Sequence, residues 1–133
     1  MKRREMRENI LRLLYLDDFH DTEELNTQFS LYFDGKDNFT EDDKQYITDK
    51  ANDILAHKDE IDQAIEAVSN KWKVERMDKV DKAILRLAYY EIKFDEDIPD
   101  VVAVNEAVEL SKKYSSEASP KFINGILSNF IPE

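Results

Sequence analysis

The sequence predicts an all-α protein that forms a single compact bundle of about seven helices. Only two glycines and three prolines occur in 133 residues, so the chain has little of the turn chemistry that β-sheets require. Apolar residues recur instead at steps of three and four, the spacing of one helix face. Since 41% of the residues are apolar and the length is typical of one domain, residues 1–133 are expected to share one core.

Four helices are predicted in the first half of the chain. The first spans about residues 3–18, and the second spans about residues 22–33 with Asp21 or Thr22 as its cap. The third helix starts at residues 40–43, and the fourth ends near Trp72. Gly35 ends the second of these. The apolar stripes of the four helices are Met6, Ile10, Leu13 and Leu14; Leu25, Phe29 and Tyr32 or Phe33; Ile47, Ala51, Ile54 and Leu55; and Ile61, Ala64, Ile65 and Val68.

Three more helices follow in the second half. The segment from about 77 to 94 is apolar around most of its circumference, which is typical of a helix in the middle of a bundle. Pro99 and the pair Ser119-Pro120 are start signals for the last two helices. Gly125 inside the last helix indicates close approach of a neighbouring helix, which would offset the cost of glycine there. The polar residues Glu91, Asn105, Glu106 and Asn124 are expected to form an interhelical or capping network.

The net charge of -11 comes from one region of the chain. Residues 17–62 contain fifteen acidic and four basic residues, whereas the other 87 residues contain fifteen of each. Basic residues gather in three segments, 2–12, 71–86 and 112–121. An acidic protein can bind nucleic acid if its cations share one face, because salt screens charges beyond about 8 to 10 Å. We expect the cations of the two ends of the chain to converge on one patch.

Two groups of residues are candidates for contact with RNA. Arg3, Arg4 and Arg7 lie three and four residues apart on the first helix, where their guanidinium groups could contact successive phosphates. A solvated helix start with internal ion pairs is the alternative. The second group combines lysines with aromatic rings, and such rings can stack on unpaired bases. It comprises Lys112, Lys113, Tyr114, Lys121 and Phe122. The alternative is that the aromatic residues belong to the core and the lysines keep the surface soluble.

A third group is a candidate for contact with a partner protein. Asp81, Leu85 and Tyr89 lie at four-residue steps and combine one charge with apolar surface. Packing of this row against a neighbouring helix of the same chain is the alternative.

Three segments at fixed offsets resemble the NusB family of bacterial transcription antitermination factors. They are Asp81-Lys82-Ala83-Ile84-Leu85-Arg86-Leu87-Ala88-Tyr89-Tyr90-Glu91, Val104-Asn105-Glu106-Ala107-Val108-Glu109-Leu110 and Lys121-Phe122-Ile123-Asn124-Gly125-Ile126-Leu127, with Arg3, Arg4, Arg7 and Leu14-Tyr15 at the start of the chain. The resemblance implies two helical sub-bundles packed together and an arginine-rich first helix that contacts boxA RNA.

The resemblance also implies the partners. A residue matching Asp81 and surface near Tyr15 would contact NusE, a small-subunit ribosomal protein, and Lys121 and Phe122 would lie on the RNA path. The implied function is non-catalytic: recognition of single-stranded boxA-type RNA in transcripts of ribosomal RNA operons, together with NusE, so that RNA polymerase resists termination. The competing hypothesis is a helical protein-interaction module that uses the acidic 17–62 region and never touches RNA.

Other functional classes lack their motifs in this sequence. His20 and His57 are isolated, and neither has a second ligand at metal-binding spacing. A glycine-rich phosphate loop is absent, so no cofactor, metal or small-molecule substrate is expected. The longest apolar run is far short of the roughly 20 residues that cross a bilayer, and there is no pattern of an export signal. We therefore expect a cytoplasmic protein that does not bind membranes.

Overall fold

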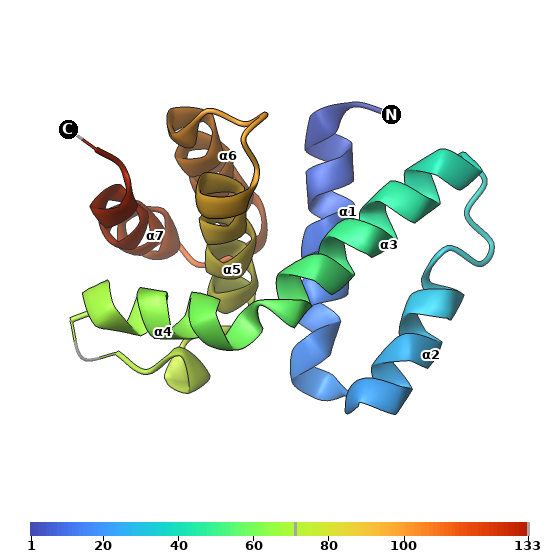
Figure 1. Cartoon of the computed structure of the whole chain (residues 1–133), viewed down its shortest axis with the longest axis horizontal. Helices are drawn as coiled ribbons and strands as arrows, with labels where there is room; N and C mark the ends of the chain where they lie inside the picture. Colours follow the sequence, from blue (N-terminus) through green and yellow to red (C-terminus); the bar gives the residue numbers. More distant parts are fainter. Residues whose placement is uncertain (71, 133) are drawn as a thin grey trace. The chain divides into compact units, whose positions relative to one another are not determined.

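The computed structural model describes residues 1–70 and 72–132, which contain seven α-helices, three short 3-10 helices and no strand. The all-α prediction is thus confirmed (Figure 1). The chain divides into two compact units, Met1–Leu55 and Ala56–Glu133. None of the helices in the described residues is long and apolar enough to span a membrane.

The N-terminal unit is built from α1 (Arg3–Leu16), η1 (Asp17–Phe19), α2 (Thr22–Tyr32) and α3 (Glu41–Ala56). After η1 the chain turns back, and α2 contacts α1 (Figure 1). The Tyr32 hydroxyl donates a hydrogen bond of 2.6 Å to the Asn9 side-chain oxygen and links the two helices. The apolar stripes predicted for these helices supply most of the buried side chains, including Ile10, Leu14 and Ile47.

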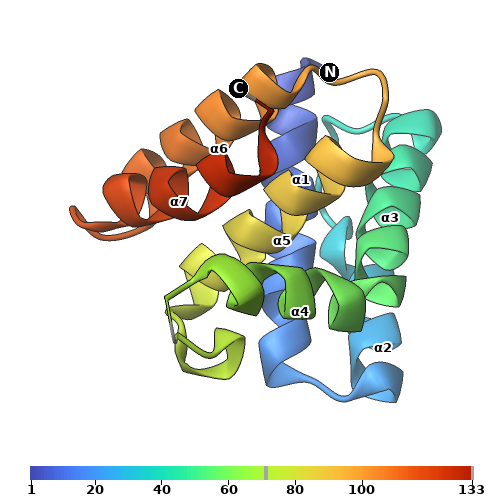
Figure 2. The same ribbon diagram turned by 60° about the vertical axis from the view of Figure 1, so that its left-hand side comes forward.

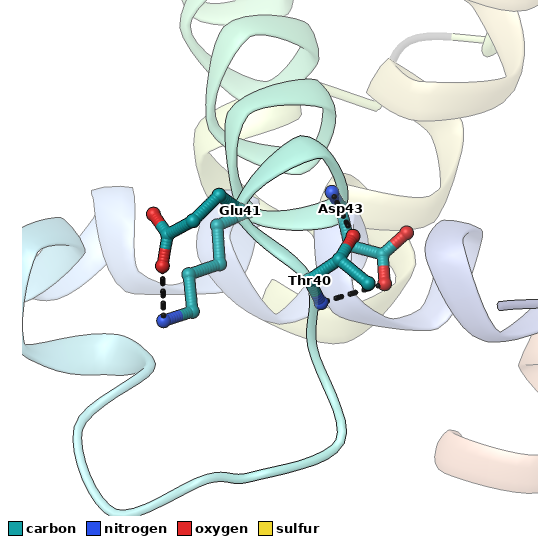
Figure 3. A network of polar contacts seen from close by, with 4 residues as sticks. Thr40, Glu41 and Asp43 are labelled. Carbon is teal, nitrogen blue, oxygen red and sulfur yellow. Dashed lines mark hydrogen bonds and ion pairs between the residues drawn. The ribbon is translucent and has the colours of Figure 1, made fainter.

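Reciprocal capping boxes begin two of these helices. At α2 the Asp21 carboxylate accepts a hydrogen bond from the Glu24 amide, and the Glu24 carboxylate accepts one from the Asp21 amide. At α3 the Thr40 hydroxyl accepts from the Asp43 amide, and the Asp43 carboxylate accepts from the Thr40 amide, both at 3.0 Å (Figure 3). These bonds satisfy amide groups that the first turn of a helix leaves without partners.

The C-terminal unit is built around α5 (Lys79–Phe94). It also contains α4 (Lys58–Val68), η2 (Val74–Arg76), α6 (Asp100–Tyr114), α7 (Ser119–Leu127) and η3 (Ser128–Phe130). Helix α5 contacts α4, α6 and α7, and Figures 1 and 2 show α6 and α7 beside it. Ten of its sixteen residues are buried, so the prediction of a central helix is confirmed.

The end of the fourth helix and part of the expected polar network differ from the predictions. The fourth helix ends at Val68 rather than near Trp72, because Asn70 adopts a left-handed conformation with φ of 55° that terminates helical geometry. The interhelical polar network also fails for two of its members, since Asn105 and Asn124 are exposed. Glu91 is buried as expected.

An ion pair joins α4 to α5. The Arg86 guanidinium donates from Nε and Nη2 to the two carboxylate oxygens of Asp62, each at 2.8 Å. Only 6% of the Arg86 side chain and 22% of the Asp62 side chain are exposed. The bidentate geometry offsets the cost of removing both charges from water, and it fixes how α4 crosses α5.

We predict that Arg86→Met destabilises the protein by about 2 to 4 kcal/mol, because it leaves the Asp62 carboxylate largely buried without its cation. Urea denaturation measures this change. The control is Glu41→Gln, which breaks the exposed Glu41–Lys44 pair at 3.3 Å and should cost less than about 1 kcal/mol. Equal losses of stability from the two substitutions would contradict the larger contribution proposed for the Arg86–Asp62 pair.

A second prediction concerns acid stability. The hydrogen bond from the Thr40 amide holds the pKa of Asp43 below its ordinary value of 3.8. In the unfolded chain Asp43 binds a proton at higher pH than in the folded chain, so its stabilising contribution is present above the ordinary value and is lost as the pH falls below it.

We therefore expect Asp43→Asn to lose less stability than the parent when the pH falls from about 5 downward, as measured by urea denaturation at several pH values. Asp42→Asn removes the same charge from an exposed position of the same turn and is the matched control. If the free energy of unfolding decreases equally steeply with falling pH for the parent and both variants, Asp43 does not contribute as described.

Candidate nucleic-acid interface

The arginines at the start of α1 do not share one environment. Arg3 and Arg4 are exposed, but Arg7 is buried, with 8% of its surface accessible. Arg7 lies three and seven residues before Ile10 and Leu14, so it falls in the buried stripe of the helix. The prediction that Arg7 presents its guanidinium group beside Arg3 and Arg4 is therefore wrong for this structure.

The second cationic group lies where α6 ends and α7 begins, and these two helices contact each other. Lys112 and Lys113 are exposed in the last turn of α6, and Lys121 is exposed on α7. The Lys112 ammonium pairs with Glu109 at 3.2 Å, and the Lys113 ammonium lies 5.3 Å from the Tyr114 ring centre. Phe122 is half-buried. The structure thus places all five residues of this group, Tyr114 included, at one pair of helix ends.

Asp81 holds this turn in place. Its carboxylate accepts hydrogen bonds from the hydroxyl groups of Ser115, at 2.6 Å, and Ser119, at 3.0 Å. The Ser119 hydroxyl also lies within hydrogen-bond distance of Ser115 and Ser116. Only 7% of Asp81 is exposed. A buried carboxylate with two hydroxyl donors fixes the geometry of the segment that carries Lys113 and Lys121.

The predicted partner-binding row on α5 is mostly internal. Leu85 is fully buried at 0% exposure, so its assignment to a docking surface is wrong. The Asp81 carboxylate accepts hydrogen bonds from Ser115 and Ser119. Tyr89 is half-buried, and its ring lies edge-on to the ring of Phe130 with 4.9 Å between the ring centres. Burial, and secondarily the negative charge of Glu60, raises the pKa of Tyr89 above 10.0. The row packs inside the unit because α5 is covered on nearly every side.

Tyr15 differs from the other residues predicted to bind a partner because it is exposed at the end of α1. Its ring lies 5.0 Å from the ring of Phe19, which is also exposed. Sequence reasoning missed Phe19 because this residue lies in η1, after the end of α1. The α-helical period no longer applies there, so it could not predict that Phe19 lies beside Tyr15. The two rings together form a small exposed apolar surface on the N-terminal unit.

Across residues 1–70 and 72–132 no cluster of three His, Asp or Glu side chains could hold a metal ion. His57 accepts or donates a 2.6 Å hydrogen bond with Glu60, and its ring stacks on Phe94 at 4.6 Å. These contacts explain His57 as a structural residue at the start of α4.

The exposed face of α7 carries an unexplained glycine. A Cβ built at Gly125 would have nothing within 4 Å, so the expected close approach of a neighbouring helix is wrong. Lys121, Asn124 and Ser128 are exposed on the same stretch of helix. Glycine in a helix costs about 1 kcal/mol relative to alanine, and nothing in the structure explains its presence here.

We predict that Gly125→Ala stabilises the protein by about 0.5 to 1 kcal/mol in urea denaturation, since alanine restricts the unfolded chain and meets no clash. Gly35→Ala is the matched control and should destabilise by about 1 to 2 kcal/mol, because Gly35 has φ of +75°. Loss of stability in Gly125→Ala would contradict the open surroundings of Gly125.

Comparison with known proteins identifies relatives over the whole chain. A model of the NusB family matches residues 4–132. Transcription antitermination protein NusB of Agathobacter rectalis is 48% identical over 130 residues, which cover 98% of this chain and 99% of the relative. The protein of the same description from Lachnoclostridium phytofermentans is 43% identical over 131 residues, with coverage of 98% and 99%.

Solved structures agree with this result. NusB of T. maritima superposes with a TM-score of 0.84 and 32% identity, covering 98% of this chain and 90% of that one. A chain from the crystal structure of antitermination factors NusB and NusE in complex with dsRNA gives a TM-score of 0.79 and 27% identity, with coverage of 96% and 94%.

Proposed function

Because this chain belongs to the NusB family of transcription antitermination proteins, we propose that it binds a single-stranded boxA-type element in transcripts of ribosomal RNA operons. It binds this element together with NusE, and the complex helps RNA polymerase pass termination signals. The chain is an adaptor in this proposal and catalyses no reaction.

The observation that carries the proposal is similarity along the full length of the chain. The family match spans residues 4–132, and a structural relative comes from a complex that contains NusE and RNA. A match of this extent includes the end of α6, the start of α7 and α1 from Arg4 onward, which bear exposed cations named above.

The chemistry of these segments suits RNA. Lys112, Lys113 and Lys121 are exposed beside Phe122 in the C-terminal unit, and Arg3 and Arg4 are exposed in the N-terminal unit. Lysine and arginine neutralise phosphates and release counterions, whereas an aromatic ring stacks on an unpaired base. Each group is small, so we propose that NusE completes the RNA surface, with Tyr15 and Phe19 among the residues that contact NusE.

The acidic region supports this choice over a module that binds a basic protein. Several of its carboxylates have partners within the chain: Asp21 and Asp43 cap helices, Glu60 pairs with His57, and Asp62 pairs with Arg86. These acids stabilise local structure and do not need an external cation to account for them.

The test is a charge-reversal experiment. Arg3, Arg4 and Lys121 are changed together to glutamate, and binding of boxA RNA is measured by gel shift with NusE present at two salt concentrations. We expect a loss of affinity of roughly 100-fold or more. The slope of the logarithm of the binding constant against the logarithm of the salt concentration should become shallower by about 0.7 per lost phosphate contact. Far-UV circular dichroism verifies that the fold is retained.

The matched control changes Lys44, Lys50 and Lys58 to glutamate, which alters the net charge by the same amount within the acidic region. Its RNA affinity should stay close to that of the parent. The proposal fails if the two variants lose affinity equally, or if the complex of parent protein and NusE binds boxA RNA no better than a scrambled sequence.

A further inference from the structure

A groove in the C-terminal unit lies beside the proposed RNA-binding residues. Its volume is about 220 Å³, and its walls include Trp72, Arg76 and Phe122, with Met77 and Ala118 contributing apolar surface. Typical sites for drug-sized ligands occupy roughly 300 to 1,000 Å³. The groove therefore suits one flat ring system rather than a larger molecule.

Trp72 is unusual among the aromatic residues of this unit. It is 56% exposed, although tryptophan is generally well buried in globular proteins. Its ring meets the ring of Phe122 edge-on, with 6.5 Å between centres. Two aromatic rings that line one groove from different segments of the chain provide surfaces on which a planar ligand can stack.

The backbone of Trp72 is held firmly despite the exposure of its side chain. The Trp72 amide donates to the Ser69 carbonyl at 3.3 Å, and the Ser69 hydroxyl donates to the Trp72 carbonyl at 2.6 Å. Ser69 itself is buried. Both backbone groups of Trp72 are thus anchored to the end of α4, which reduces the entropy that ligand binding would cost.

The charges around the groove favour an RNA strand. Arg76 lies on its wall and is exposed. Lys73 and Lys121, the sequence neighbours of the wall residues Trp72 and Phe122, are also exposed. The two carboxylates of the groove are already occupied: Asp78 accepts hydrogen bonds from the amides of Val80 and Asp81, and Asp81 accepts from two serines. These bonds hold the two carboxylates in place, and the exposed cations at and beside the groove are the groups that can bind a phosphate.

We propose that this groove binds one unpaired base of the RNA, with Trp72 and Phe122 in contact with the base and Arg76 in contact with an adjacent phosphate. The proposal rests on the proposed function and deepens it, because it adds Trp72 and Arg76 to the RNA-binding residues. It also gives one exposed cation of the basic 71–86 segment, Arg76, a role in binding RNA that the family resemblance does not assign.

The first test uses the unmodified protein, because Trp72 is the single tryptophan of the chain. The complex of this protein with a tryptophan-free NusE is titrated with boxA RNA while tryptophan emission is recorded. We expect quenching on binding. Replacing each nucleotide in turn by an abasic one should abolish the quenching at one position, or two adjacent ones, while binding remains measurable.

The second test uses substitutions. Trp72→Ala should weaken RNA binding roughly 5- to 100-fold without changing its dependence on salt, whereas Trp72→Phe, which keeps a ring, should stay within about 3-fold of the parent. Arg76→Gln should reduce the salt dependence by about the value of one phosphate contact. Tyr46→Ala removes an exposed ring from α3 and is the matched control, with unchanged affinity expected.

The outcomes separate this proposal from the proposed function. If the parent complex binds boxA RNA specifically but emission is unchanged and Trp72→Ala binds normally, the base site is refuted and the proposed function stands. If NusE alone quenches Trp72 and RNA adds nothing, the groove is a protein contact. If the parent complex shows no specific RNA binding, both proposals fall.

Discussion

The burial of α5 on nearly all sides is the constraint on which the C-terminal unit depends. Charged side chains on the covered faces of this helix, such as Asp81 and Arg86, are removed from water and must find partners inside the protein. Asp81 accepts hydrogen bonds from Ser115 and Ser119, and Arg86 forms a bidentate pair with Asp62. These contacts tie α4 and the turn between α6 and α7 to one central helix.

The proposed RNA-binding surface of this unit depends on this arrangement. The turn that Asp81 holds is flanked by Lys112 and Lys113 on one side and by Lys121 and Phe122 on the other, and Asp81 also lines the groove that contains Trp72. A buried carboxylate therefore positions residues that would meet RNA, although it is hidden from RNA itself. Binding residues held on packed helix ends lose little freedom when a ligand arrives.

The acidic character of the chain is compatible with this role because many carboxylates serve structural purposes. Asp21 and Asp43 satisfy amides at helix starts, and Asp62 neutralises Arg86. In the proposed function, the charge that acts on RNA is the local one at the start of α1, the end of α6 and the start of α7, because salt screens charges that lie more than about 10 Å away. A weak patch on each unit fits a protein that shares its RNA with a second protein.

The sequence by itself determined the helices, and it did so for a physical reason. Apolar side chains repeat with the period of a helix, and the capping residues Asp21, Thr40 and Asp78 satisfy the first amides of α2, α3 and α5. Both signals are local. The family resemblance likewise depended on segments of consecutive residues, and the comparisons confirmed it.

Only the tertiary structure decided which face of each helix is covered. Arg7 and Leu85 were predicted to meet ligands and are buried, because periodicity shows which residues share a face but not what packs against it. The pairs that position the site join residues 24, 34 and 38 apart in the chain, a separation at which no local pattern operates. Trp72 met Phe122 in one groove for the same reason: packing of the folded chain brought together two residues that the sequence keeps fifty positions apart.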